Sequence, residues 1–146
     1  MNNAAKYFDG VVKAGNENEE RQQFLDLIAT TYSKEADYIE KYEFRNALST
    51  AMNLARKGNK YLADSEPWKL IKQDEAATAG ILYNAIQVVG HLGILLKPFL
   101  PQTAERIREM LQLNPDQMNW ATDKILLSEG HQIGKPQLLF QKVEDQ

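Results

Sequence analysis

The stretch "ALSTAMNLARKGNKYLADSEPWKLIKQD", residues 47–74, decides how the fold is read. Apolar residues recur at helical spacing through its first half and just before it: Phe44, Leu48, Ala51, Met52 and Ala55. This pattern predicts a helix over residues 44–62. Gly58 and Asn59 are expected to weaken or bend the helix near its end, because glycine costs about 1 kcal/mol relative to alanine inside a helix.

The second half of the stretch predicts a short helix that carries an aromatic side chain near its start. Ser65 is the expected N-cap, and Glu66 and Pro67 fall in the first turn, where proline sacrifices no hydrogen bond. Trp68 follows, one of two tryptophans in the chain. A tryptophan here either fills a core or is held out for a partner to stack on, and the residue pattern leaves both readings open.

Helical patterns also dominate the rest of the chain. A helix is expected over residues 19–42, with one face formed by Phe24, Leu27, Ile28, Thr31, Ile39 and Tyr42. Residues 75–97 are the most apolar and predict a central helix, and after a break at Pro98 a further helix over residues 103–111 is opened by Pro101. A turn at Asn114 and Pro115 leads into a short helical stretch that ends at Trp120.

The remaining residues change in character and predict an extended tail. The string "KILLSEGHQIGKPQLLFQKVEDQ" contains two glycines, one proline and two short apolar runs. The fold class is therefore all-α: one helical bundle over about residues 17–120, with an extended C-terminal tail over about residues 121–146, in a single domain. Within the tail, residues 125–144 are expected to be extended and only partly buried. Leu138, Leu139 and Phe140 are expected either to cover apolar surface on the bundle or to await a missing partner.

The composition is that of an ordinary globular domain. The chain has 146 residues, of which 43% are hydrophobic and 25% charged, and it contains no cysteine, which excludes disulfides and thiolate metal sites. The longest apolar stretch, residues 80–96, includes Asn84, Gln87 and His91, so it predicts a buried helix rather than a membrane span. We expect a cytoplasmic protein with no membrane partner.

Charge is distributed unevenly along the chain. Residues 16–43 hold eight acidic and three basic side chains, whereas residues 56–72 hold five basic and two acidic ones. The basic cluster surrounds Pro67 and Trp68, a combination that suits a polyanion with bases to stack. A basic cluster is also found on many solvated helix faces with no ligand.

No catalytic or metal-binding motif is present. His91 and His131 are the only histidines, and no carboxylate lies three or four residues from His91, as the helical Glu-x-x-His metal sites require. The chain also lacks a glycine-rich phosphate loop and a nucleophile motif. We expect no metal, no catalytic residue and no cofactor in this chain, and we interpret His91 as a core histidine with its hydrogen bonds satisfied.

Residues 47–74 resemble the anticodon-binding domain of methionyl-tRNA synthetases. That family has a helix ending in Asn-Lys/Arg-Tyr, here residues 59–61, followed by Pro-Trp, here residues 67–68. The resemblance continues through "LLKPFLPQTAERIREML", residues 95–111, and ends with "KPQLLFQKVEDQ", residues 135–146. It covers most of the chain from about Tyr7 onward and implies a helical bundle of the type found in class I synthetases.

Two parts of the family pattern are missing from this sequence. The catalytic signatures His-Ile-Gly-His and Lys-Met-Ser-Lys-Ser do not occur, and neither does the upstream helix with the Asn-x-x-x-Arg pair that reads anticodon bases in the family. The resemblance therefore implies a fragment of a longer enzyme that joins methionine to its tRNA using ATP. We expect the fragment to be a monomer without activity of its own, with the tRNA anticodon loop and the catalytic half of the parent enzyme as its partners.

The resemblance assigns the tRNA-binding role to Trp68, which would stack on an anticodon base, and to Pro67, which would fix the start of its helix. Lys60, Lys69 and Lys72 are candidates for phosphate contacts on charge and position alone. Three residues are expected to be structural: Asn59 at a helix end, and Tyr61 and Trp120 in packing. The alternative is a helical protein-interaction domain without RNA binding, and a free-standing enzyme is the third reading.

Overall fold

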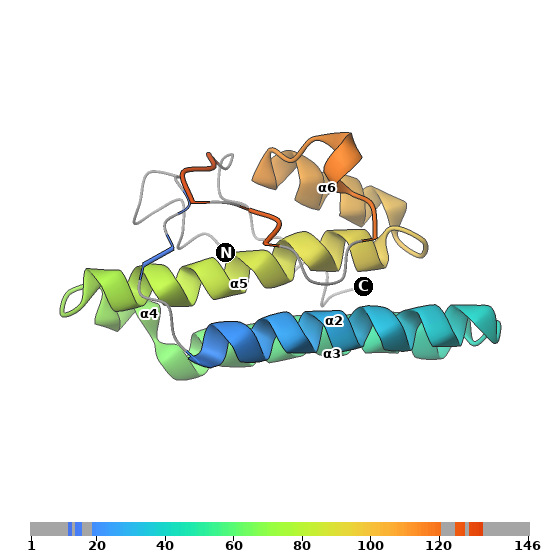
Figure 1. Cartoon of the computed structure of the whole chain (residues 1–146), viewed down its shortest axis with the longest axis horizontal. Coiled ribbons are helices and arrows are strands. Elements are labelled where there is room, and N and C mark those ends of the chain that lie inside the picture. The colour runs from blue at the N-terminus through green and yellow to red at the C-terminus, as the bar shows by residue number, and fades with distance from the viewer. Residues whose placement is uncertain (1–11, 13, 16–18, 121–124, 128, 133–146) are drawn as a thin grey trace.

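The chain folds into a helical bundle in the computed structural model, which describes residues 12, 14–15, 19–120, 125–127 and 129–132. The elements are α2 (Glu19–Glu40), α3 (Phe44–Ser65), α4 (Pro67–Leu70), α5 (Glu75–Leu96), α6 (Pro101–Leu111) and the 3-10 turn η1 (Pro115–Gln117). Helices α2 and α3 run side by side as a hairpin, α5 packs along both, and α6 lies on the other side of α5 (Figure 1). The all-α prediction is confirmed.

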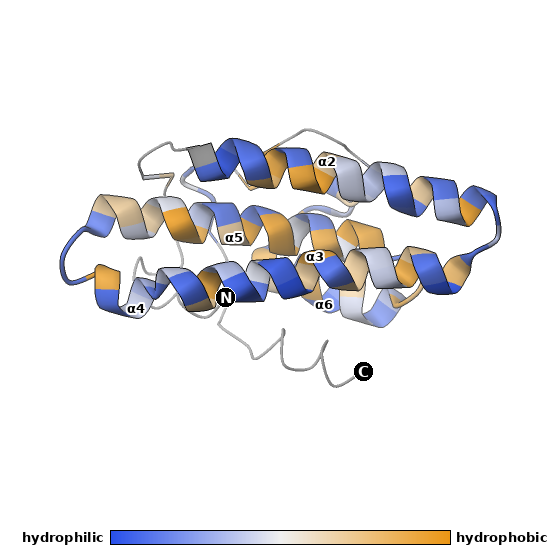
Figure 2. Cartoon of the chain, turned by 90° about the horizontal axis from the view of Figure 1, so that it is seen from below, coloured by the Kyte–Doolittle hydropathy of each residue, from blue (hydrophilic) through white to orange (hydrophobic). Residues whose placement is uncertain are grey.

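Helix α5 is the centre of the core. All its residues from Thr78 to Leu96 are buried, and its apolar side chains meet Ile28, Leu54 and Ile107 of the surrounding helices. Among the described residues it is the single helix that is long and apolar enough to cross a membrane, and all of that apolar stretch is buried within the bundle. It is the buried core helix that the sequence predicted, and it is more uniformly hydrophobic than the amphipathic α2 and α3 beside it (Figure 2).

Helix α3 is longer than the sequence predicted. It continues through Gly58 and Asn59 to Ser65, beyond the predicted end at residue 62, so Asn59 lies within the helix and not at its end as expected. The reason is tertiary packing: a Cβ atom on Gly58 would lie 3.2 Å from Cγ1 of Val88, so the missing side chain lets α3 approach α5 closely. Burial against α5 offsets the helix-forming penalty of glycine.

The turn between α2 and α3 corrects two further predictions. Tyr42 and Phe44, which were assigned to the apolar faces, are 81% and 51% exposed. They flank a tight turn at one end of the bundle, where Tyr42 takes a left-handed conformation with φ 60°, and their rings pack edge-on with centroids 6.2 Å apart. Tyr42 lies in the turn and Phe44 is the first residue of α3, so both lie beyond the parts of α2 and α3 that pack on the core.

A buried polar cluster joins α2 to α5. The hydroxyl of Tyr32 lies 2.9 Å from Nδ1 of His91, which is fully buried, so His91 is the satisfied core histidine that the sequence predicted. One turn further along α2, Glu35 is 0% exposed, and neither carboxylate oxygen has a hydrogen-bond partner. Burial raises the pKa of Glu35 to about 8.

The described part of the C-terminal segment is non-helical and is bound to the bundle. Gln87 holds it: Oε1 accepts from the backbone N–H of Leu126 and of Leu127 at 2.8 and 2.9 Å, and Nε2 donates to the Leu127 carbonyl at 2.6 Å. Further on, the carbonyl of His131 accepts from the Val12 N–H at 2.8 Å. These residues are non-helical, as predicted, but residues 126–127 and 129–130 form bends and a turn instead of an extended strand. Leu138, Leu139 and Phe140 lie outside the described residues.

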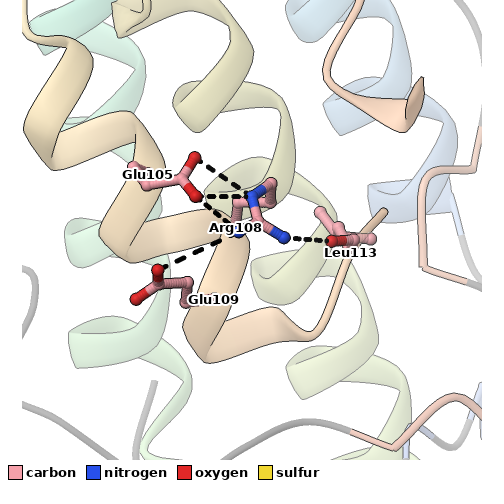
Figure 3. A network of polar contacts seen from close by, with 4 residues as sticks. All are labelled: Glu105, Arg108, Glu109 and Leu113. Atoms are coloured by element: carbon pink, nitrogen blue, oxygen red, sulfur yellow. Dashed lines mark hydrogen bonds and ion pairs between the residues drawn. The ribbon is translucent and has the colours of Figure 1, made fainter. Parts of the chain in front are cut away.

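The end of α6 is fixed by a surface network around Arg108. Its guanidinium pairs with Glu105 and lies 3.9 Å from Glu109, while Nη1 donates to the carbonyl of Leu113 at 2.9 Å (Figure 3). Gln112 ends the helix in a left-handed conformation, with φ 54°. The network therefore positions the turn into η1, which replaces the longer helical stretch expected up to Trp120.

Candidate nucleic-acid interface

The short helix α4 presents the predicted tryptophan. Glu66 links α3 to α4 in a left-handed conformation, with φ 48°, and its N–H donates to the Leu62 carbonyl at 3.1 Å. The prediction that Ser65 caps the helix is wrong: Ser65 is the last residue of α3, and Glu66 is the N-cap without a side-chain hydrogen bond. A non-glycine residue rarely adopts this conformation, and here it turns the chain within one residue.

Contacts with α5 fix the orientation of α4. Pro67 is the first residue of α4 and is buried, and Ile71 just after the helix packs with Leu62 against Ala79 and Leu82 of α5. The side chain of Asp74 then caps α5 by accepting from the Ala77 N–H at 3.0 Å. Helix α4, the platform that carries Trp68, is therefore held against the central helix of the bundle.

Trp68 is 43% exposed on this platform, as the stacking interpretation requires. Its neighbour Pro67 is buried against the protein. Pro67 therefore anchors the helix, and Trp68 is exposed to a ligand. An indole with this exposure offers part of its face to a planar ligand. Such a surface suits an unstacked nucleic-acid base, for which aromatic stacking contributes about 1–3 kcal/mol.

The three predicted lysines lie at the same end of the bundle, on the last turns of α3, on α4 and in the turn after it (Figure 1). Two of them are held by acids: Lys60 Nζ lies 2.9 Å from Asp64 Oδ2, and Lys69 Nζ lies 3.1 Å from Glu66 Oε2. Lys72 is exposed and pairs with no acid among the described residues. Both ion pairs are on the surface, where such pairs contribute little, so a phosphate can compete for these lysines.

Tyr61 of the family motif and Trp120, the second tryptophan of the chain, have structural roles in the bundle. The ring of Tyr61 packs on Phe24 with centroids 4.6 Å apart, and its hydroxyl accepts from Asn84 Nδ2 at 3.1 Å, which confirms the packing prediction. Trp120 also packs, edge-on to Tyr32 with ring centroids 5.3 Å apart. It is nevertheless 43% exposed, the same fraction as Trp68.

Sequence reasoning missed a polar groove between α2 and α3. It has a volume of about 410 Å³, and its charged lining is three lysines and one aspartate: Lys34, Lys41, Lys57 and Asp37. Lys34 was not predicted as a binding residue because it lies in the acidic stretch, residues 16–43. A count of charges along the sequence does not show which face of the helix each residue occupies. Helical spacing was the available signal: positions 34, 38 and 41 of α2 share a face, as do positions 50, 53 and 57 of α3.

Within the described residues, no three histidine, aspartate or glutamate side chains come together as metal ligands. The exposed tryptophan and the surrounding lysines are thus the features with the clearest binding chemistry.

Two solved structures have the same fold. A free-state structure of Mycobacterium tuberculosis methionyl-tRNA synthetase superimposes with a TM-score of 0.87 and 24% identity, covering 95% of this chain and 29% of that one. A structure of the same enzyme bound by methionyl-adenylate gives a TM-score of 0.87, with 95% and 28% covered. At this identity the likeness establishes the class of fold, a synthetase-type helical bundle.

The sequence defines the family more narrowly. The profile of the anticodon binding domain of methionyl tRNA ligase matches residues 11–146, so the chain belongs to that family. A methionine–tRNA ligase of Bacteroides fragilis is 45% identical over 96% of this chain and 21% of its own length. One from Pyrococcus furiosus is 40% identical over 96% of this chain and 19% of its own length. The chain spans about a fifth of the length of these relatives.

Proposed function

We propose that this chain binds the anticodon loop of a tRNA, with Trp68 stacking on a base that has left the loop. The observation that carries the proposal is the half-exposed indole on a helix anchored by buried Pro67, in a chain of the anticodon-binding family. Single-stranded RNA loops are read in this way, because their unstacked bases expose both faces. Lys60, Lys69 and Lys72 contact the neighbouring phosphates.

The chain acts as part of a methionine–tRNA ligase, which attaches methionine to its tRNA using ATP in a catalytic part outside this chain. The names of the relatives and the methionyl-adenylate in one structural neighbour support this assignment. The parent enzyme works in the cytoplasm, and the chain by itself is a monomer. Pyrophosphate exchange with methionine and ATP should be absent when this chain is assayed alone, and such activity would contradict the assignment.

The experiment is a binding titration of a methionine-accepting tRNA with the chain and its Trp68→Ala variant. Loss of the stacking surface should weaken binding by about 1–3 kcal/mol, and Trp68→Phe should retain part of the affinity because a smaller ring still stacks. Trp120→Ala is the matched control, since Trp120 is exposed to the same extent but packs on Tyr32.

The salt dependence of tRNA binding distinguishes this proposal from the alternative, a protein-interaction domain without RNA binding. Binding through phosphate contacts weakens steeply with rising salt, with a slope of about −0.9 for each phosphate neutralised in a duplex and about −0.7 in a single strand. If the chain bound tRNA no better than it binds an unrelated RNA, or if Trp120→Ala weakened binding as much as Trp68→Ala, the anticodon assignment would be wrong.

A further inference from the structure

A row of polar residues on α3 leads from the groove between α2 and α3 toward α4, the helix that carries Trp68. The members of the row recur at intervals of three or four and so share one face of α3: Lys60, Lys57, Asn53 and Thr50. The helical rise of about 1.5 Å per residue puts the ends of this row about 15 Å apart. The last three residues of the row line the groove, and Lys60 lies one turn beyond it toward α4.

The charge of the groove favours an anion. Lys34 on α2 and Lys57 on α3 are exposed, both line the groove, and neither pairs with an acid among the described residues. The one acid of the lining, Asp37, is already bound to Lys41, with its Oδ2 3.0 Å from Nζ. The rest of the polar lining consists of hydroxyls and one amide: Thr30, Thr31, Tyr38, Thr50 and Asn53. The hydroxyls of Thr31 and Thr50 already donate to carbonyls of their own helices, at 2.7 and 2.8 Å. Thr30, Tyr38 and the Asn53 amide are the lining groups that can donate hydrogen bonds to phosphate oxygens.

We propose that this groove is a second RNA contact, which binds backbone phosphates of the helical stem that follows the loop held at Trp68. The inference rests on the proposed function. An RNA hairpin whose loop lies at Trp68 continues as a stiff duplex. The groove runs along the bundle axis from Lys57, about two helical turns before the end of α3, to Lys41 at the turn between α2 and α3. A stem that follows α3 away from Trp68 therefore passes over the groove. Lysines contact phosphates without regard to sequence, so the groove positions the stem while Trp68 reads the loop.

Two RNAs and two double variants test the inference. The RNAs are a hairpin with the anticodon loop and its stem, and a single-stranded oligonucleotide with the loop sequence alone. The variants are Lys34→Glu/Lys57→Glu, in the groove, and Lys97→Glu/Arg106→Glu, which makes the same change of charge on exposed residues of the α5–α6 side. The groove variant should bind the hairpin about tenfold or more weakly and with a shallower salt slope, because phosphate contacts set that slope. The control variant should bind nearly as the unchanged chain does.

The single strand separates the groove from the Trp68 surface. Trp68→Ala should weaken binding of both RNAs, whereas the groove variant should weaken the hairpin more than the single strand. Equal effects of the groove and control variants would overturn the inference, since only overall charge would then matter. The same holds if the groove variant binds the hairpin as the unchanged chain does while Trp68→Ala weakens it, which leaves the proposed function intact.

Failure of the unchanged chain to bind either RNA would overturn the proposed function and this inference together. Circular dichroism and thermal unfolding check that each variant is folded. If the charge reversals unfold the chain, Lys34→Gln/Lys57→Gln replaces them, with a smaller loss of hairpin affinity in the same direction.

Discussion

Two polar regions of this bundle are built in opposite ways. Around Trp68 the charged groups lie on the surface and pair within one helical turn, as Lys60 does with Asp64. Between α2 and α5 the polar groups are buried, with Tyr32 bonded to His91 and Glu35 left without a hydrogen-bond partner. Surface pairs contribute little to folding, whereas buried polar groups contribute or cost a great deal. The first region can therefore change with little effect on the fold, and the second cannot.

The largest effect is expected in the buried cluster. Tyr32→Ala removes a fully buried ring that also contacts His91 and Trp120, and truncation of a core aromatic costs about 3–5 kcal/mol. The free energy of unfolding from urea titration should fall by that amount. Binding of tRNA, measured at a temperature where the variant is still folded, should stay near that of the unchanged chain. A loss of stability below about 1 kcal/mol would contradict the idea that the buried cluster supports the fold more than the Trp68 surface does.

Glu35 makes the buried cluster sensitive to pH. Its pKa rises from 4.5 in the unfolded chain to about 8 in the fold because of burial. Between these pH values the folded protein keeps a proton that the unfolded chain has lost, so the free energy of unfolding falls as the pH rises through this window. Above about pH 8 the carboxylate is charged in both states, and the penalty stays constant.

The variant Glu35→Gln isolates this contribution, because a neutral amide of the same shape does not titrate. Its stability relative to the unchanged chain should increase between pH 5 and pH 8, by about 1.4 kcal/mol at most for each pH unit. Glu40→Gln, on the exposed side of the same helix, should leave the pH dependence unchanged. If both variants behaved alike, Glu35 would not be the titrating group.

The helices were predictable from the sequence because their apolar faces repeat every three to four residues. The failures occurred where a different interaction decides. Gly58 is read as a weak point in a helix, but contact with Val88 of a distant helix makes its lack of a side chain useful. The left-handed Glu66 has no signal in the sequence, since nothing marks that residue for a positive φ.

The candidate site was predictable in part. Pro67 and Trp68 were found because the pair is part of a recognisable motif, and the exposure of Trp68 followed as an expectation from it. Lys34 and the groove required the pairing of α2 with α3, which no local pattern specifies. The burial of Glu35 also depends on tertiary packing, which the count of acidic residues over 16–43 does not show.

Trp68→Ala has a moderate effect that sharpens the comparison, because it should affect binding without affecting folding. An exposed side chain supports little of the core, so the free energy of unfolding should change by no more than about 0.5 kcal/mol. Thermal unfolding beside the tRNA titration measures both quantities on one sample. A loss of several kcal/mol in stability would show that the indole supports the bundle and would place Trp68 with Tyr32 instead.

The smallest effects are expected from the single lysines, and their order is the test. Lys72 pairs with no acid among the described residues, whereas Lys60 and Lys69 are shared with Asp64 and Glu66. A phosphate can therefore bind Lys72 without displacing an acid, whereas at Lys60 and Lys69 it must compete with an existing ion pair. Lys72→Ala should reduce the salt slope of tRNA binding by up to about 0.9, and Lys60→Ala and Lys69→Ala should reduce it less.

Removal of the acid that competes for Lys60 should have the opposite effect on tRNA affinity. Asp64→Asn should strengthen tRNA binding slightly, because Lys60 is then released and one negative charge is lost from the surface. Asp26→Asn, which removes an exposed acid of α2 that accepts a hydrogen bond from Gln22, serves as the control for charge alone. If Asp64→Asn and Asp26→Asn strengthened binding equally, the pairing of Lys60 with Asp64 would be irrelevant to RNA, and the lysines of this surface would act only through the overall field of the protein.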